Sequence, residues 1–260
     1  MKLEDIVYEK KDGIATITMN RPKVYNAFRT RTLREMARAL EDAELDRAVG
    51  VVVLTGAGDK SFCTGGDSKE VDDSAGYSQE MDYWHTRVHQ AIRTLPKPVI
   101  AAVNGYAIGG GHILHLICDL TIAADHAKFG QAGPRVGSFD AGFGAAYLAR
   151  VVGEKKAREI WFLCRQYSAE QALEMGLVNK VVPLESLMKE VDGWCREVLA
   201  LSPTALKFLK AAFNADSDSI FGIEQMSMGA VRLYWENPEA QEGRQAYLEK
   251  RKPDWGRFRK

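Results

Sequence analysis

The sequence predicts an α/β fold that ends in a helical segment, and two features support this prediction. Up to about residue 182, apolar β-branched runs alternate with segments whose apolar residues recur every three or four positions, as in sheets covered by helices. From Leu184 to about Lys250 the helical pattern continues without further strands. We therefore expect an α/β core at 1–200 and a helical C-terminal segment at 201–260 that serves packing or oligomerisation.

The first half of the chain is expected to contain a hairpin followed by alternating helices and strands. Two β-rich runs flank Lys11-Asp12-Gly13, which is a turn signature. The run 49–55 is continuously apolar and β-branched, as in a parallel strand buried on both faces. The polar stretch 69–77 predicts a surface loop that would act as a lid. The expected elements are strands 6–8 and 14–19, helix 32–46, strand 49–55, helix 83–93 and strand 98–103.

The second half repeats the alternation before the chain becomes helical. Ser168 and Gln171 stand at capping-box spacing and predict a helix start. Ser202-Pro203 and Asn237-Pro238 interrupt the C-terminal helices, because proline cannot continue a preceding helix. The expected elements are helix 113–118, strand 120–124, helices 144–152 and 154–162, a short helix to 176, strand 177–182, and helices from 184 to about 250.

Charge and hydropathy exclude several classes of protein. The 35 basic residues balance the 35 acidic ones, so no overall positive field would recruit nucleic acid or an anionic membrane. No stretch reaches the roughly 18 consecutive apolar residues of a spanning helix, and residues 1–5 lack the apolar region of a signal peptide. We expect a soluble cytoplasmic protein without nucleic-acid or membrane partners.

Cysteine and histidine spacings do not predict a bound metal. The cysteines are scattered singly without a C-x-x-C pair, so we expect buried reduced thiols at Cys63, Cys118, Cys164 and Cys195. His112 and His115 stand three residues apart, but the sequence places no third ligand beside them. His85 and His89 lie on an amphipathic segment and are expected to face solvent. The expected metal content is none.

Glycine-rich bends carry the main chemical signal. The loop 105–111 contains three consecutive glycines and follows the apolar run 98–103, so a buried strand is expected to end in a bend with exposed backbone N–H groups. Such amides can bind an oxyanion. A second glycine-rich bend is 62–67, and the polar turn 130–140 follows the loop by about twenty residues.

Five motifs share an order and spacing: Asn20-Arg21-Pro22, Asn26-Ala27-Phe28, Phe62-Cys63-Thr64-Gly65-Gly66-Asp67, Pro98-Val99-Ile100-Ala101 and Gly105-Tyr106-Ala107-Ile108-Gly109-Gly110-Gly111. This set resembles the enoyl-CoA hydratase/isomerase (crotonase) superfamily over essentially the whole chain. The resemblance implies a crotonase-like spiral of ββα units, an acyl-CoA substrate, and a homotrimer or homohexamer. It also implies an oxyanion hole in which the N–H groups of Gly66 and Gly110 bind the thioester oxygen.

The resemblance also indicates which chemistry is missing. Hydratases of this family use two glutamates as acid and base, and the matching positions here hold Ile113 and Gly133. Neither residue can transfer a proton, so addition of water by a carboxylate pair is not expected. The carboxylate that remains is Asp140, which would activate water and would be positioned by Ser138, two residues before it.

Within the family, segments 130–144 and 157–167 resemble two kinds of enzyme that work the same type of C–C bond through a thioester enolate. One is 2-ketocyclohexanecarboxyl-CoA hydrolase, which opens a ring. The other is 1,4-dihydroxy-2-naphthoyl-CoA synthase of menaquinone biosynthesis, which closes one. We favour the hydrolase, which residues 1–9 and 249–253 also resemble, and keep the synthase as the alternative. A non-catalytic relative that binds acyl-CoA or RNA is the third hypothesis.

The resemblance assigns roles to further residues. The synthase binds bicarbonate, and the resemblance implies that Gln131, Gly133 and Trp161 would hold it here. Trp161 could instead be an aromatic residue of the hydrophobic core. Two tyrosines are implied as proton donors: Tyr77 matches one, whereas the other falls on Trp235 with Tyr234 beside it. No tightly bound cofactor is expected besides coenzyme A in the substrate and the bicarbonate of the synthase hypothesis. The residues implied to contact coenzyme A are Ala27, Arg29 and Lys250.

Overall fold

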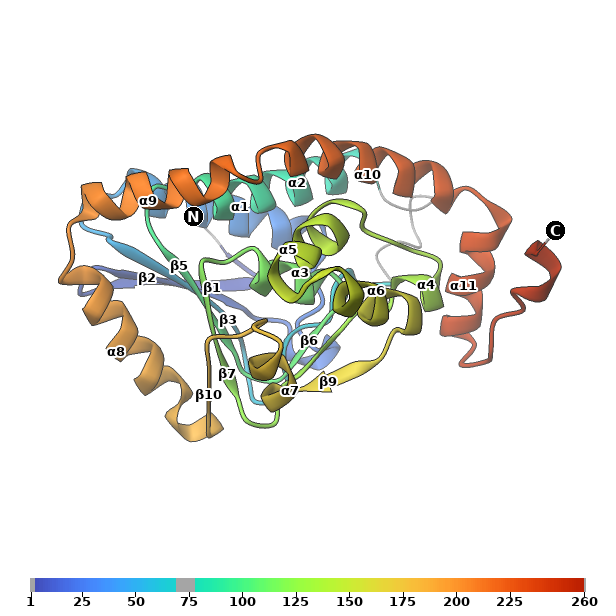
Figure 1. Ribbon diagram of the computed structural model, residues 1–260, viewed down its shortest axis with the longest axis horizontal. Helices are drawn as coiled ribbons and strands as arrows, with labels where there is room; N and C mark the ends of the chain where they lie inside the picture. Colours follow the sequence, from blue (N-terminus) through green and yellow to red (C-terminus); the bar gives the residue numbers. More distant parts are fainter. Residues whose placement is uncertain (1–2, 69–77, 260) are drawn as a thin grey trace.

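The main sheet of the protein has six strands in the order β1-β2-β3-β5-β7-β10. The computed structural model describes residues 3–68 and 78–259, so the expected lid and Tyr77 lie outside the described residues (Figure 1). β1 and β2 form the predicted antiparallel hairpin, and the remaining neighbours pair in parallel. The strands are β1 Ile6–Lys11, β2 Ile14–Met19, β3 Val51–Gly56, β5 Val99–Val103, β7 Leu120–Ala124 and β10 Lys180–Val182.

Helices cover both faces of this sheet and make up the C-terminal segment. A π-helical turn at Gly142–Tyr147 leads directly into α5. The helices are α1 Thr30–Leu45, α2 Gln79–Thr94, α3 Gly110–Leu116, α4 Gly133–Val136, α5 Leu148–Val152, α6 Glu154–Leu163, α7 Ala169–Glu174, α8 Leu187–Leu199, α9 Pro203–Ala215, α10 Ser219–Trp235 and α11 Pro238–Leu248. The short 3₁₀ turns are Pro22–Val24, Leu184–Ser186 and Gly256–Phe258.

Strand β3 shows why the main sheet is buried on both sides. Successive side chains of a strand point to opposite faces. Val52 and Leu54 belong to the larger core, together with residues of α1 and α2. Val51 and Val53 point the other way and share a smaller core with residues of α8. Every residue of β3 is buried, as its continuously apolar sequence predicted.

A second sheet, which the sequence did not predict, carries the bends described above. Its four strands lie in the order β4-β6-β8-β9, and the first three pair in parallel. The strands are β4 Ser61–Cys63, β6 Tyr106–Ile108, β8 Lys128–Gly130 and β9 Gln166–Ser168. The carboxyl ends of parallel strands meet at one edge of a sheet, where ligands of such folds bind. The bends that follow β4, β6 and β8 are therefore brought together.

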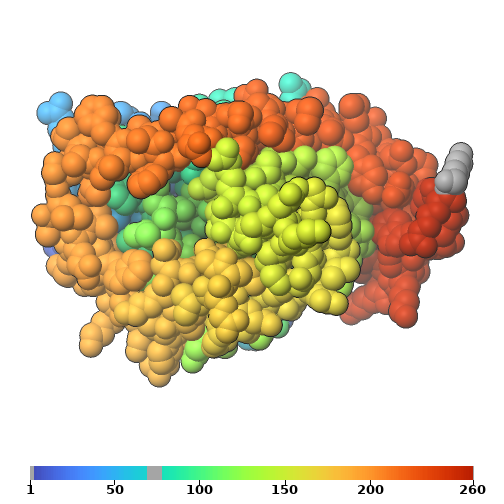
Figure 2. All heavy atoms as spheres, viewed as in Figure 1, coloured from blue at the N-terminus to red at the C-terminus, as the bar shows by residue number. Residues whose placement is uncertain are grey.

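The C-terminal helices pack on the core of the same chain. In Figure 1, α9 and α10 run along one long edge of the molecule, and α11 closes its end beside α4. The space-filling view shows the same edge filled by these helices (Figure 2). Lys210 of α9 is buried, and its Nζ lies 2.7 Å from Asp119 Oδ2 and 2.9 Å from the carbonyl oxygen of Ile92. The predicted division at residue 200 falls between α8 and α9.

Two further expectations can be compared with the structure. The predicted α/β class with a helical C-terminal segment is confirmed. The four cysteines are free and buried, as predicted. Within residues 3–68 and 78–259, the helices are all too short or too polar to cross a bilayer.

Candidate active site

A cavity of about 690 Å³ lies where the bends of the second sheet meet α10 and α11. Its lining includes glycines of two bends, the carboxylate of the third, and apolar side chains of the C-terminal helices. Of the residues predicted for the site, the lining contains Ala27, Gly66, Gly110, Gln131, Gly133, Ser138, Asp140 and Trp161. The second sheet thus explains why motifs far apart in the sequence share one site.

The bend after β6 needs each of its three glycines for a different reason. Gly109 has a φ of 57°, which L side chains rarely adopt. A Cβ on Gly110 would lie 2.7 Å from the ring of Phe28, and one on Gly111 would lie 1.9 Å from the carbonyl oxygen of Cys63. Gly110 is the first residue of α3, where backbone N–H groups have no partner within the helix.

The bend after β4 lies directly against this helix start. Phe28 N–H donates to the carbonyl of Gly65 at 2.8 Å, and Asp67 N–H donates to the carbonyl of Phe28 at 2.8 Å. These two bonds fix Gly66 between them. A Cβ on Gly65 would lie 3.0 Å from the Gly110 nitrogen, so the two bends are in contact. Neither Gly66 N–H nor Gly110 N–H donates to another described residue, and both glycines line the cavity. The arrangement suits a paired-amide oxyanion hole.

Asp140 brings a carboxylate with perturbed acidity to the same cavity. Its side chain is buried, and Oδ1 accepts a hydrogen bond from Gly144 N–H at 2.9 Å. Burial, and after it the negative charge of Glu224, raise the pKa of Asp140 to about 7, while His89 and the backbone N–H groups of Gly144 and Gly142 oppose the shift. A carboxylate with a pKa near neutrality is suited to act as a general base.

The two hydratase positions are in the cavity but cannot do acid–base chemistry. Ile113 and Gly133 both belong to the lining. A Cβ on Gly133 would lie 2.6 Å from the carbonyl oxygen of Ser138 and 3.0 Å from the ring of Trp161. The backbone here therefore leaves no room for a glutamate at this position.

The residues implied to bind bicarbonate lie close together, but two of their donors already have partners. Trp161 Nε1 donates to the carbonyl of Gly144 at 2.6 Å. Gln131 Nε2 lies 3.2 Å from His112 Nδ1, within hydrogen-bond distance. A bound anion would have to replace these contacts or use the other polar atoms of the site.

The remaining predicted residues lie away from the cavity. Arg29 makes a two-pronged ion pair with Asp5, at 2.7 and 2.9 Å, and does not line the cavity. Tyr234 packs against Phe139, with ring centroids 5.6 Å apart, and is not in the lining. Lys250 is exposed after the end of α11. The geometry of this chain alone thus offers no support for these three roles.

Sequence reasoning missed most of the residues that α10 and α11 supply to the cavity. The lining residues are Met228, Val231, Trp235, Arg244 and Tyr247, of which the resemblance had indicated Trp235 alone. The first three recur at helical spacing and so were recognisable as a buried face. Nothing in the sequence indicated that this face closes the site of its own chain. Asp67 was also missed as a lining residue, and its Oδ2 pairs with Arg21 at 2.7 Å.

The expectation that His85 and His89 face solvent was wrong. Both rings are buried, and His85 lines the cavity. The rings lie 4.1 Å apart between centroids because they are one helical turn apart on the inner face of α2. His89 Nδ1 lies 2.9 Å from Glu224 Oε1 on α10, and the donor atoms of the three residues lie within 4.8 Å of one another. These residue types can ligate a metal, but the 2.9 Å separation is that of a direct hydrogen bond.

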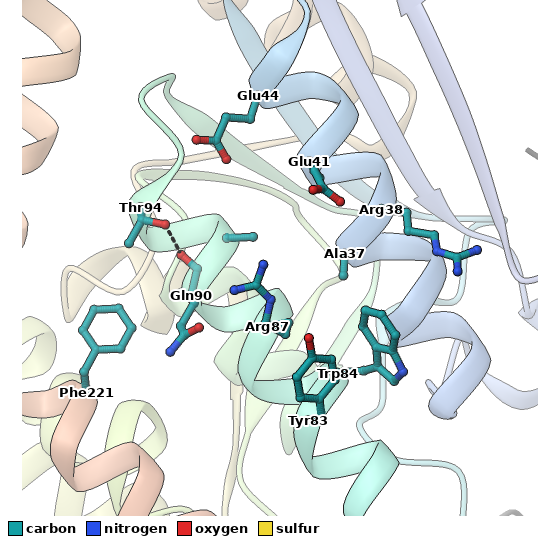
Figure 3. Close-up of a pocket in the computed structure, with 11 residues that line it drawn as sticks. Ala37, Arg38, Glu41, Glu44, Tyr83, Trp84, Arg87, Gln90, Thr94 and Phe221 are labelled. Carbon is teal, nitrogen blue, oxygen red and sulfur yellow. Dashed lines mark hydrogen bonds between the residues drawn. The ribbon is translucent and has the colours of Figure 1, made fainter.

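A second cavity, of about 600 Å³, lies between α1 and α2 (Figure 3). Glu41 and Glu44 of α1 face Arg87 of α2 across it, and Phe221 of α10 lies at its edge. None of the residues selected from the sequence motifs lines it. The candidate active site is therefore the cavity that contains Asp140.

Comparisons with known proteins concern the chain as a whole. Residues 9–258 match the family model for enoyl-CoA hydratase/isomerase. An enoyl-CoA hydratase from Mycobacterium avium subsp. paratuberculosis is 29% identical, with a TM-score of 0.85 over 97% of this chain and 99% of that one. An enoyl-CoA hydratase/carnithine racemase from Magnetospirillum magneticum is 32% identical, with a TM-score of 0.78 over 97% and 96%. EchA1_1 from Mycobacterium paratuberculosis is 32% identical, with a TM-score of 0.86 over 96% and 98%.

Proposed function

The chain belongs to the enoyl-CoA hydratase/isomerase (crotonase) superfamily of acyl-CoA enzymes, and on this premise we propose that it opens a ring of a cyclic β-ketoacyl-CoA by hydrolysis. One observation carries the proposal. Asp140, a buried carboxylate whose pKa is raised to about 7, shares a cavity with the amides of Gly66 and Gly110. A base beside an oxyanion hole suits a reaction that passes through a thioester enolate.

The proposed reaction begins with water. Asp140 takes a proton from a water molecule, and the hydroxide adds to the ring ketone carbon. The resulting alkoxide collapses, and the bond between this carbon and the α-carbon breaks with its electron pair on the α-carbon. The ketone becomes a carboxylic acid, and the thioester becomes an enolate whose oxygen accepts from Gly66 and Gly110. Each such donor contributes about 3 kcal/mol to stabilising the developing charge.

The α-carbon then needs a proton to give the mono-CoA ester of a dicarboxylic acid. Tyr247 of α11 is the candidate donor, because the resemblance implies a donor from the C-terminal helices and, of Tyr234 and Tyr247 there, Tyr247 lines the cavity. The proton taken by Asp140 returns to solvent, and the Tyr247 phenol is restored by solvent. The sum of the steps is one substrate and one water giving one product.

The naphthoyl-CoA synthase reaction is the second candidate. Its support is that Gln131, Gly133 and Trp161 all line the cavity. Against it, Trp161 N–H already donates to Gly144, and the Gln131 amide nitrogen already lies against His112. Hydrolysis needs no bicarbonate, so the occupied donors favour ring opening.

The deciding experiment offers 2-ketocyclohexanecarboxyl-CoA and o-succinylbenzoyl-CoA separately and identifies products by mass. The proposal expects pimeloyl-CoA from the first and no naphthoyl product from the second. Asp140→Asn should abolish the turnover. Asp67→Asn, which changes another carboxylate of the cavity, is the control and should retain most of it. Naphthoyl product alone would replace the proposal by the second candidate, and wild-type turnover by Asp140→Asn would remove Asp140 as the base.

A further inference from the structure

Two carboxylates hold consecutive amides of the π-helical turn beside the cavity. Gly144 N–H donates to Asp140 Oδ1 at 2.9 Å, and Phe143 N–H donates to Glu224 Oε2 at 3.1 Å. Because neighbouring amide nitrogens are only a few ångströms apart, the carboxylates that bind them must lie close together. Asp140 is 8% exposed and Glu224 only 1%, so water screens their repulsion poorly.

The π-helical turn lies directly against both carboxylate side chains. A Cβ on Gly142 would lie 2.1 Å from Glu224 Oε2, and a Cβ on Gly144 would lie 2.8 Å from Asp140 Cβ. The two glycines therefore mark the places where the carboxylate side chains press against the turn. Glu224 comes from α10, so the C-terminal segment fixes this arrangement.

The groups around the pair supply no fixed positive charge to it. His89 of α2 faces both carboxylates, and His85 faces Glu224. Burial lowers the pKa of His89 to about 4 and that of His85 to about 3, so both rings are neutral near pH 7. Among described residues, His89 Nε2 and His85 Nδ1 have no hydrogen-bond partner. Arg93 of α2 stacks on Tyr147, at the other end of the turn, with 4.6 Å between its Cζ and the ring centroid.

We propose that Glu224 is a positioning residue whose buried negative charge makes Asp140 hold a proton more tightly and so turns it into an effective general base. The proposal deepens the proposed function and rests on it for the role of Asp140 as base. Burial raises the pKa of Glu224 as well as that of Asp140. Like charges in a poorly screened site compete for one proton, so the pair titrates as a unit. His89 Nδ1–H donates the hydrogen bond that keeps the ionised Glu224 in place.

Glu224→Gln tests the charge with little change of shape. The amide oxygen can still accept from Phe143 N–H, and the amide nitrogen can donate to His89 Nδ1 when the neutral ring carries its proton on Nε2. The Asp140 carboxyl is titrated in the substrate-free protein by infrared difference spectra, assigned by comparison with Asp140→Asn. We expect its midpoint to fall by on the order of one pH unit in Glu224→Gln, as removal of a nearby buried charge requires. The acid limb of the pH–rate profile should move to lower pH by a similar amount.

Two controls separate charge from structure. Ser227→Ala removes an uncharged hydrogen bond between α10 and the start of the π-helical turn, in which Ala141 N–H donates to Ser227 Oγ at 2.7 Å. Glu35→Gln neutralises a buried carboxylate that binds the amides of Glu4 and Asp5, away from the cavity. Both variants should keep the wild-type midpoint of Asp140.

The outcomes distinguish this inference from the proposed function. An unchanged midpoint in Glu224→Gln would overturn the inference, whatever the enzyme turns over. If the Asp140 midpoint shifts in Glu224→Gln but the wild type turns over neither thioester, the inference is supported and the proposed ring opening is not. A shift that Ser227→Ala reproduces would make Glu224 merely structural. A wild-type midpoint that moves when EDTA is added would assign the cluster to a metal ion and also overturn the inference.

Discussion

Gly66 and Gly110 provide equivalent amides, but a side chain would meet different surroundings at each. At Gly110 an added Cβ would lie 2.7 Å from two ring atoms of Phe28, itself buried. At Gly66 the nearest atoms would be Met81 Cε at 3.6 Å and a Phe28 ring carbon at 3.7 Å, which are ordinary contacts. Neither glycine has a positive φ. The two positions therefore differ only in the space that is available for an added side chain.

We predict that Gly110→Ala destabilises the protein and that Gly66→Ala does not. Overpacking against a buried ring costs about 1–3 kcal/mol of unfolding free energy, because Phe28 or the helix start must move. The free energy of unfolding in urea measures the difference, with Gly66→Ala as the matched control. Equal losses in the two variants would contradict this account of the bends.

At the level of single residues, the sequence predicted part of the site. The resemblance selected Gly66, Gly110 and Asp140, and the structure brings all three to one cavity. Glu224 and His89 were missed, because a buried polar residue on an amphipathic helix looks the same in sequence as an exposed one. Only its partner across the fold reveals it, and that partner is 135 positions away.

Among the elements, the long ones were predictable and the short ones were not. β3 and α1 are long enough to show a recognisable sequence pattern: a continuous apolar run in β3 and apolar residues three or four positions apart in α1. Both were predicted with small errors at their ends. The second sheet is built from strands of 3 residues, such as β6, too short to show any period. This sheet nevertheless brings the site together, so the sequence predicted the motifs but not the element that joins them.

A buried cation helps to hold helix α9 to the core, which gives an element-level prediction. Lys210 Nζ bonds Asp119 Oδ2 and the carbonyls of Ile92 and Lys97, at 2.7, 2.9 and 3.1 Å. We predict that Lys210→Met lowers the unfolding free energy by about 1–3 kcal/mol, because Asp119 loses its cation and the carbonyls of Ile92 and Lys97 lose a donor. Faster proteolysis between α8 and α9 should accompany the loss.

Two further variants test that explanation. Lys207→Met, at an exposed position of the same helix, should leave stability nearly unchanged. Adding Asp119→Asn to Lys210→Met should recover part of the loss, since it removes the unpaired charge. A double variant no more stable than Lys210→Met would refute the unpaired-charge explanation.

For the whole molecule, the C-terminal helices both complete the cavity and present apolar surface outward. Phe208 and Phe213 of α9 are 65% and 76% exposed, and Leu233 of α10 is 72% exposed. Outward apolar faces of this kind are typical of subunit contacts. They are consistent with the homotrimer or homohexamer expected from the family, which stays a prediction for this chain.

The buried Asp140 also lowers the stability of the whole molecule at neutral pH. Its pKa is about 7 in the folded chain and close to 3.8 when unfolded. Well below pH 3.8 both states hold the proton, and the group does not change the stability. As the pH rises from 4 to 7, only the unfolded state ionises, so unfolding becomes easier. The full penalty, at most about 4 kcal/mol at 1.36 kcal/mol per pKa unit, is reached above pH 7.

We therefore predict that Asp140→Asn is more stable than the wild type at pH 8 and that its advantage shrinks towards pH 4. The Asn side chain keeps an oxygen that accepts from Gly144 N–H, so the turn should persist. Unfolding free energies of both proteins across this pH range measure the effect. In Asp42→Asn the sign should reverse, because hydrogen bonds from Lys10 and Tyr8 lower the pKa of Asp42, which therefore stabilises the folded state above pH 4. An advantage of Asp140→Asn that is the same at pH 4 and pH 8 would show that proton linkage is not its cause. A variant that gains stability while losing ring opening would identify Asp140 as a residue kept for chemistry at the expense of folding.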